Sequence, residues 1–359
     1  MRRLSPLTLL LAAFGLLLLL SSCQSRQARG EYYEITGYAQ GGIYSVKLRT
    51  DGCNLSPEAL KTGIDSVLTL IDTTLSGYNP ASQLSRFNAG EPIRPNALFL
   101  TMYERAYAFW EQSGGVLDFA AGPLFDAWGF GFKDGNELPD AQTVSGILAG
   151  CGMKRLHADI RAAIREDGTL APEDLLLSPG PLPRLNYNAI AQGFSCDLVA
   201  DYLRSHGSED FLVNIGEIYC QGLNPSGQGW TVGVDAPIDG NDSPGEDIRG
   251  LWDSHGEACG IVTSGNYRKF SIGPDGEKYV HTIDPRTGYP VRSSLLSATV
   301  TAPDAATADA LATWCMVIGT EASRALIASL GEGYSCYLIY DEDGEMRVSP
   351  SPGFYLVQP

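Results

Sequence analysis

The spacing of apolar residues predicts helices and strands interspersed along the chain. Apolar and polar residues alternate over 44–48, which predicts a strand. After Ser56-Pro57, a pair typical of a helix start, apolar residues recur at helical spacing as far as residue 71. A second pattern of this kind covers 97–112 and ends at Ser113-Gly114-Gly115. The chain is therefore expected to continue from a strand into two long helices.

The predicted elements beyond residue 112 follow no strict strand–helix–strand rhythm. Two segments rich in glycine, 118–131 and 237–255, are expected to be irregular, the first facing a ligand and the second forming an exposed insertion. No Rossmann glycine fingerprint and no P-loop occurs. The mixture predicts an α+β fold. Helices are expected to end at Gly150 and His206 and to cover 305–317 and 321–330, and strands are expected over 211–215, 231–234, 260–263, 296–301, 336–340 and 355–357.

The first 22 residues are predicted to be a lipoprotein signal peptide. Two arginines precede an apolar run over 9–20, which is about 12 residues long and too short to span a bilayer comfortably. Small residues then lead to Cys23, as in a bacterial lipobox, whose cysteine receives a lipid and becomes the new N-terminus. An ordinary signal peptide with a chance cysteine is the alternative. On the first interpretation, residues 23–31 are a lipidated tether that anchors the protein to a membrane on the extracytoplasmic, periplasmic side.

The remaining residues, 32–359, suffice for one large domain or two intimately packed subdomains. The formal net charge of −17 argues against a nucleic-acid partner, whose phosphates would be repelled. This charge still allows a small anionic ligand, because local donors and a metal ion can overcome the net field. The cysteines after Cys23 are widely spaced without a Cys/His metal pattern, so most are expected to be small buried side chains rather than disulfide partners.

Three polar stretches carry candidate chemistry, and the first is Asn-Tyr-Asn-Ala-Ile-Ala-Gln-Gly over 186–193. It precedes a predicted helix, whose first amide groups lack intrahelical acceptors and whose dipole is positive at this end. Such a helix start can bind a phosphate oxygen. Simple capping by an asparagine is the alternative.

The second stretch combines 263–268 with His-Thr-Ile-Asp-Pro-Arg-Thr-Gly over 281–288. Two arginines, one histidine and one aspartate stand close together in the sequence, beside hydroxyl side chains. A histidine such as His281 can transfer a proton to or from a hydroxyl near neutral pH. Asp-Pro-Arg-Thr-Gly is also a sound turn sequence, so a plain turn started by Asp284 is the alternative.

The third stretch is Asp-Ala-Leu-Ala-Thr over 309–313, inside a predicted helix. Positions four apart share one helix face, so the Asp309 carboxylate and the Thr313 hydroxyl are expected one turn apart. Hard oxygens so placed suit Mg²⁺, which takes waters and phosphate oxygens as its other ligands. The alternative is that Asp309 only complements the helix dipole near the N-terminus.

Together these stretches resemble the FAD:protein FMN transferases, the ApbE lipoproteins, over about 35–357. The motifs stand in the order of that family. They are Ser76-Gly77-Tyr78-Asn79-Pro80, Ser85-Arg86-Phe87-Asn88, Gly114-Gly115-Val116-Leu117-Asp118, Gly122-Pro123-Leu124, Trp128-Gly129-Phe130-Gly131, Asn188-Ala189-Ile190-Ala191-Gln192-Gly193, Gly216-Glu217-Ile218, Thr263-Ser264-Gly265-Asn266-Tyr267-Arg268, 281–288 and Ala308-Asp309-Ala310-Leu311-Ala312-Thr313.

The resemblance implies two packed α/β subdomains with a cleft for FAD and Mg²⁺ between them. A Thr or Ser hydroxyl of a target flavoprotein would attack the FMN-side phosphorus of FAD, and AMP would leave. The family's metal ligands correspond to the Ala189 carbonyl and the side chains of Asp309 and Thr313. His281 corresponds to the histidine associated with transfer, and Arg268 could stabilise charge on the phosphates. The positions implied to contact the flavin nucleotide are Gln40, Tyr78, Val116, Leu117, Asp118, Asn186, Gln192 and Ile283.

The chain departs from the family pattern at three of these positions. Asn186 stands where the family usually has Asp, which removes a negative charge beside the expected metal site. Gln192 replaces a commonly charged residue, and Gln40 occupies a position often taken by Met. Most of these changes keep size or hydrogen-bonding capacity, so we expect altered affinity rather than an inactive protein.

Three functions fit this pattern. The first is transfer of FMN from FAD to an acceptor, which is expected to be a flavoprotein with an exposed Thr/Ser motif. The second is an FAD pyrophosphatase that gives FMN and AMP, an alternative that Asn186 keeps open. The third is a non-catalytic lipoprotein that binds FAD to store or deliver it.

Overall fold

The computed structural model describes residues 30–132, 138–156, 160–175, 184–238, 245, 247–267, 270–272 and 276–357. The predicted signal peptide, the lipobox Cys23 and the candidate residue Arg268 lie outside the described residues. Within these ranges, no helix combines the length and the apolar character needed to cross a membrane.

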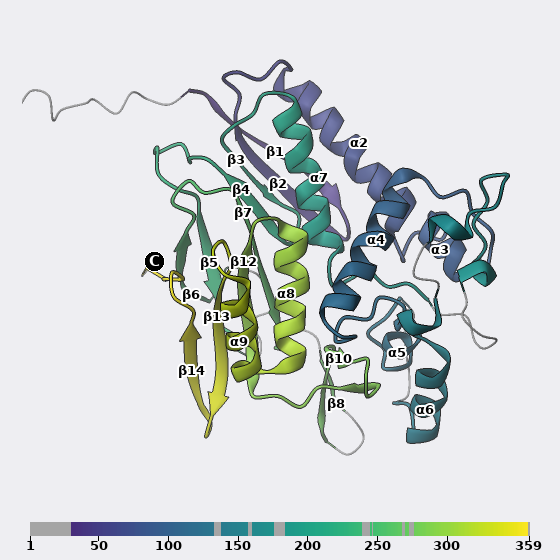
Figure 1. The fold of residues 1–359 in the computed structure, drawn as a ribbon. Helices are drawn as coiled ribbons and strands as arrows, with labels where there is room; N and C mark the ends of the chain where they lie inside the picture. The colour runs from purple at the N-terminus through teal and green to yellow at the C-terminus, as the bar shows by residue number, and fades with distance from the viewer. Residues whose placement is uncertain are drawn as a thin grey trace, which may run out of the picture.

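An eight-stranded sheet runs through the described part of the chain in the order β1-β2-β3-β4-β7-β12-β13-β14 (Figure 1). Every neighbouring pair is antiparallel. β12 is buried along almost its whole length, because both faces of the sheet are covered there. The strands are β1 (Tyr32–Ala39), β2 (Gly42–Arg49), β3 (Phe211–Asn214), β4 (Ile218–Gln221), β7 (Cys259–Gly265), β12 (Leu295–Ala302), β13 (Ser335–Glu342) and β14 (Glu345–Pro350).

Four helices pack along one face of this sheet (Figure 1). They are α2 (Pro57–Leu75), α7 (Ala191–Ser205), α8 (Ala305–Ile318) and α9 (Thr320–Leu330). Leu60 and Ile64 of α2 and Val199 of α7 are fully covered against Val46 and Val213 of the sheet. Burial of apolar surface in this layer is the main force that holds the helices on the sheet.

The opposite face of the sheet is covered by a hairpin and by the C-terminal segment. β5 (Thr231–Asp235) and β6 (Ile248–Asp253) pair in antiparallel register. Trp230, Trp252 and Phe354 pack there against sheet residues such as Ile339.

A second group of helices lies beside the sheet (Figure 1). It comprises α3 (Gln83–Asn88), α4 (Ala97–Gln112), α5 (Gly122–Ala127) and α6 (Ala141–Gly150), with short 3₁₀ turns at Met153–Arg155, Arg161–Ala163 and Pro172–Leu175. The short pairs β8 (Phe270–Ile272) with β9 (Lys278–Val280), and β10 (Ile283–Asp284) with β11 (Tyr289–Pro290), complete the described fold.

Capping side chains fix the starts of three long helices. Ser56 accepts a hydrogen bond of 3.3 Å from the Ala59 amide at the start of α2. Asn96 accepts one of 2.9 Å from Phe99 at the start of α4. Asp304 does the same for α8 through the Thr307 amide, at 2.8 Å. Each cap satisfies an amide that the helix itself leaves unpaired.

The predicted order of elements is largely confirmed. The strand over 44–48, the helices starting at 57, 97 and 305, and the helix ending at Gly150 all occur. The irregular interpretation of 118–131 was wrong in part, because Gly122-Pro123 starts the short helix α5. The insertion over 237–255 contains β6, and the strand over 355–357 is only an isolated bridge from Val357 to Leu251.

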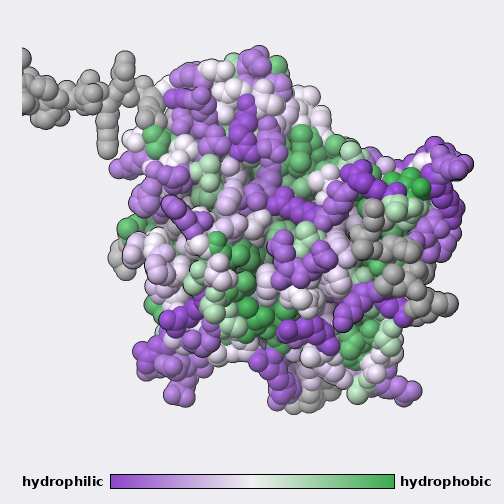
Figure 2. All heavy atoms as spheres, viewed as in Figure 1, coloured by the Kyte–Doolittle hydropathy of each residue, from purple (hydrophilic) through white to green (hydrophobic). Residues whose placement is uncertain are grey.

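The described cysteines form no disulfide, and five of the seven are buried. This agrees with the expectation of small apolar side chains. In space-filling view, hydrophilic residues spread over much of one face, with hydrophobic areas between them (Figure 2).

Candidate active site

The contact between α7 and α8 joins two of the polar stretches. Asp309 of α8 is only 5% exposed, and its Oδ2 accepts a 3.2 Å hydrogen bond from the Gly193 amide near the start of α7. In a regular helix the Gly193 amide would bond to the Ala189 carbonyl. The Asp309 carboxylate accepts this hydrogen bond instead. Within the described residues, no backbone amide bonds to the Ala189 carbonyl, so its lone pairs can accept another partner.

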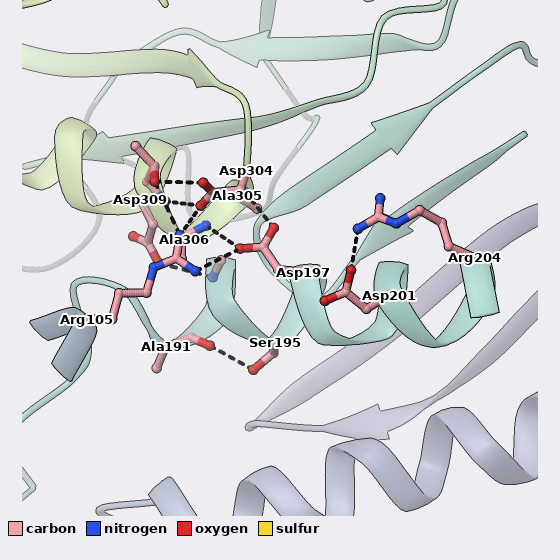
Figure 3. A network of polar contacts seen from close by, with 12 residues as sticks. Arg105, Ala191, Ser195, Asp197, Asp201, Arg204, Asp304, Ala305, Ala306 and Asp309 are labelled. Atoms are coloured by element: carbon pink, nitrogen blue, oxygen red, sulfur yellow. Dashed lines mark hydrogen bonds and ion pairs between the residues drawn. The ribbon is translucent and has the colours of Figure 1, made fainter. Parts of the chain in front are cut away.

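A second carboxylate bonds in the opposite direction across this contact (Figure 3). Asp197 of α7 accepts hydrogen bonds from the amides of Ala305 (2.7 Å) and Ala306 (3.0 Å), in the first turn of α8. Arg105 of α4 lies 3.9 Å from Asp197 and forms an ion pair with Asp304, the residue that caps α8. Three helices are therefore tied together at the start of α8.

Burial raises the pKa values of both Asp197 and Asp309. The negative charge of Asp197 further raises the pKa of Asp309, and the negative charge of Asp304 further raises the pKa of Asp197. No basic side chain in the described part of the chain bonds to Asp309. Its ionised form would therefore gain from a nearby cation.

The residues predicted to hold Mg²⁺ fit a cation in their chemistry. The Thr313 hydroxyl lies one helical turn beyond Asp309 and 3.4 Å from the Ser264 hydroxyl at the end of β7. Carboxylate, hydroxyl and carbonyl oxygens are the ligands Mg²⁺ prefers. In the described ranges, no three His, Cys, Asp or Glu side chains gather into a metal-binding group. A cation here would therefore depend on the Ala189 carbonyl and on oxygens of the substrate.

Two glutamines of the predicted flavin-contacting set lie close to the start of α7. Gln40 occupies the β1–β2 turn with a positive φ of 52° and donates a hydrogen bond to Ser195. Gln192 donates to the Ile215 carbonyl at 3.2 Å. Both side chains are thus held by the scaffold.

Asp118 lies in the loop between α4 and α5. Its carboxylate accepts hydrogen bonds from the amides of Ala120 (3.0 Å) and Met153 (2.9 Å). Burial raises the pKa of Asp118 to about 6, although these amide bonds act in the opposite direction. Val116 and Leu117 precede it with side chains covered by protein. The carboxylate is thus the polar group that this loop can offer to a nucleotide.

Asn186 connects this loop to the start of α7. Its backbone amide donates a 2.7 Å hydrogen bond to the Phe119 carbonyl, and its side-chain Oδ1 accepts one of 2.9 Å from the Asn188 backbone amide. The second bond is the local asparagine turn foreseen as an alternative. The N-cap residue of α7, Ile190, makes no side-chain cap. The Ala191 amide instead donates a 2.8 Å hydrogen bond to the Tyr187 carbonyl, and the Gly193 amide donates to Asp309.

Tyr78 presents an aromatic surface after α2. Its side chain is 69% exposed and meets the Phe132 ring edge to face, with ring centroids 5.0 Å apart. A planar ring system could stack on such a side chain.

The two halves of the second polar stretch meet in the structure. The buried Thr282 hydroxyl donates a 2.7 Å hydrogen bond to the Asn266 side chain. His281 is half-buried, and its ring centroid lies 6.4 Å from that of Phe130. Ile283 packs in a cluster with Leu124 of α5. These contacts connect the His281 segment to the loop around α5.

Sequence reasoning missed Asp197, Arg105, Asp304 and Ser195, which support the predicted residues. A usable signal existed for one of them, because Gly193 and Asp197 are four apart and must share a face of the predicted helix. Arg105 and Asp304 are almost 200 residues apart in sequence, so their contact had no local signal.

A separate hollow of about 710 Å³ lies between β6 and the C-terminal segment. Its lining includes Asp247, Arg249 and Tyr337 but none of the predicted site residues. It has no part in the site described above.

Comparison with known proteins identifies the family. The ApbE family model matches residues 32–338. The chain belongs to the ApbE family. A relative from Vibrio cholerae, FAD:protein FMN transferase, is 33% identical over 322 residues, which are 88% of this chain and 89% of the relative. The Haemophilus influenzae protein of the same name is 29% identical over 349 residues, covering 95% of each chain.

Solved ApbE structures share the fold. The flavin transferase ApbE from Vibrio cholerae superposes with a TM-score of 0.74 at 30% identity, covering 90% of this chain and 97% of the other. Pseudomonas stutzeri flavinyl transferase ApbE in its apo form gives 0.74 at 27% identity, covering 90% and 95%. The predicted family and the α+β ApbE fold are therefore confirmed.

Proposed function

We propose that this protein transfers FMN from FAD to a Thr or Ser hydroxyl of an acceptor flavoprotein and releases AMP. The hydroxyl oxygen forms a bond to the phosphorus of the FMN half, and the bond from that phosphorus to the bridging oxygen breaks. The hydroxyl proton passes to a base, and the bridging oxygen leaves with AMP.

One observation carries the proposal. The buried Asp309 accepts the hydrogen bond of the Gly193 amide and leaves the Ala189 carbonyl, just before α7, available to a cation. The similarity to FAD:protein FMN transferases over most of both chains supports the same substrate.

We assign the cation site to Mg²⁺ with the Ala189 carbonyl, Asp309 and Thr313 as protein ligands. When bound, Mg²⁺ would neutralise charge on the pyrophosphate. The residues themselves place a carboxylate and a hydroxyl on one face of α8, opposite the uncapped start of α7.

The other predicted residues divide between binding and proton transfer. Tyr78 offers a stacking surface, while Gln40, Asp118, Asn186 and Gln192 offer polar groups fixed by the scaffold. His281 serves as the base for the acceptor hydroxyl, because an imidazole can accept a proton near neutral pH. Arg268 is assigned to the phosphates through the family resemblance.

The N-terminus adds a location to the proposal. Cys23 follows a short apolar run and small residues, as in a lipobox. Lipid on this cysteine would hold the enzyme at a membrane on the extracytoplasmic side, where membrane-bound flavoprotein subunits are suitable acceptors.

The test measures the AMP that the full-length protein, in detergent, releases from FAD in the presence of Mg²⁺. It is run with and without an acceptor domain that bears the Thr motif. AMP matched by a flavin-sized mass increase on the acceptor supports the proposal, and an acceptor with Val in place of that Thr serves as control. Free FMN and AMP with an unmodified acceptor would make the protein a pyrophosphatase. FAD binding without any AMP would leave a flavin carrier.

A further inference from the structure

The α7–α8 contact is reciprocal. Asp309 of α8 accepts the Gly193 amide of α7, while Asp197 of α7 accepts the Ala305 and Ala306 amides of α8. On each helix the donors and the acceptor stand three or four residues apart and so share one face. Two oppositely directed sets of charge-assisted hydrogen bonds therefore fix the same pair of helix turns (Figure 3).

The backbones of α7 and α8 are in direct contact at these turns, without space for a side chain at Gly193. A Cβ added at Gly193 would lie 2.3 Å from the Ala305 carbonyl oxygen, closer than real Cβ contacts allow. The absence of a side chain at Gly193 lets the helices approach until both sets of hydrogen bonds can form.

Arg105 supports Asp197 from a third helix. Its guanidinium lies 3.9 Å from Asp197, pairs with Asp304 and reaches the Thr307 hydroxyl at 3.2 Å. A buried carboxylate is costly without such a cation and such amide donors. Asp197 is therefore held in one orientation, with its oxygens directed at α8.

We propose that Asp197 is a positioning residue for the divalent cation of the transfer reaction, an inference that rests on the proposed function. The expected ligands come from both helices, with the Ala189 carbonyl just before α7 and Asp309 and Thr313 on α8. Mg²⁺ requires nearly ideal octahedral geometry, so the relative placement of α7 and α8 decides whether these oxygens reach one ion. Asp197 sets that placement without being a ligand itself.

The test compares Asp197→Asn with Asp304→Asn. Asp304 also caps the first turn of α8, but from within the same segment, so its loss weakens the helix start without releasing α7 from α8. Binding of Mn²⁺ to the full-length protein with saturating FAD and no acceptor is followed by the EPR signal of free Mn²⁺. Thermal unfolding is recorded in parallel.

We expect D197N to weaken Mn²⁺ binding about 10- to 100-fold, as for residues that orient metal ligands, and D304N to weaken it less than about threefold. Both variants should unfold at lower temperature than wild type. Equal Mn²⁺ affinities in D197N and D304N would overturn the inference and reduce Asp197 to a helix cap. Wild-type protein that binds no Mn²⁺ and releases no AMP would instead overturn the proposed function.

A second variant keeps the test decisive if D197N does not fold. Asp197→Glu retains the charge and both acceptor oxygens but lengthens the link to α8 by one methylene. We expect D197E to remain folded and to lose Mn²⁺ affinity at least about tenfold. Wild-type affinity in folded D197E would contradict a positioning role.

Discussion

The α7–α8 contact and the turn over 284–288 both contain aspartates, but the hydrogen-bond partners of these aspartates differ in distance along the chain and in charge. In the turn, Asp284 accepts three hydrogen bonds of 2.8–2.9 Å from Arg286, which is only two residues away. In the helix contact, Asp309 bonds to an amide more than 100 residues distant and has no basic partner in the described ranges.

The difference extends to protonation. Burial alone would raise the pKa of Asp284, but the hydrogen bonds and the charge of Arg286 lower it below its ordinary value. Burial raises the pKa of Asp309. A carboxylate neutralised by a local arginine is complete as a structural unit. A buried carboxylate without such a partner is available to a cation.

The largest effect is expected from Asp309→Asn. Loss of the charged ligand should lower the rate of AMP formation about 10³-fold, since a metal ion contributes several kcal/mol to charge stabilisation. The rate is measured at saturating FAD over a range of Mg²⁺ concentrations. Asp201→Asn on the exposed side of α7 is the matched control and should retain nearly full activity. Full activity in D309N would remove the assigned cation site.

His281→Gln should have the next largest effect. Loss of the base is expected to slow FMN transfer about 10²-fold while the dissociation constant for FAD stays within about twofold. Transfer is followed by acceptor mass and FAD binding by flavin fluorescence. His255→Gln, whose side chain is 81% exposed, serves as the comparison. A loss confined to FAD affinity would assign His281 to binding instead.

The pH dependence of unfolding tests the contrast between the two aspartates. Because the folded-state pKa of Asp309 is raised, its protonated form favours the folded protein. This stabilisation is fully present below about pH 4, the pKa of an unfolded Asp, and is lost as the pH rises through the folded-state pKa. Between pH 5 and 8, the metal-free wild type should lose on the order of 1 kcal/mol of unfolding free energy relative to D309N. Urea titrations with a chelator measure this difference. An unchanged difference would mean that Asp309 ionises normally.

The smallest effect is expected from Asp284→Asn. The ion pair with Arg286 is partly exposed, so its loss should cost less than about 1 kcal/mol of unfolding free energy near neutral pH. A lowered folded-state pKa stabilises above the unfolded pKa, so this small cost should vanish as the pH falls through the folded pKa. Urea unfolding at pH 7 and pH 3 measures it. A loss of unfolding free energy several times larger would show that Asp284 stabilises more of the fold than its own turn.

Local patterns predicted the long helices and central strands because their periodicity and caps lie within a few residues. Ser56, Asn96 and Asp304 cap helices whose starts the sequence already indicated. The pairing of Asp309 with Gly193 could not be predicted in this way, because it depends on how two helices pack. The short helix α5 was missed because its glycine- and aromatic-rich sequence also suits a loop.

The order of strands has a consequence for how the chain folds. β2 pairs with β3, which follows it by about 160 residues, and β3 then leads through β4 to the centre of the sheet. The N-terminal hairpin therefore has no further strand to pair with until more than half of the chain is available. A topology with such distant contacts folds slowly, because closing the long intervening loop costs conformational entropy before the contacts between the strands stabilise the pair. The central sheet is thus expected to form only after most of the chain has been synthesised.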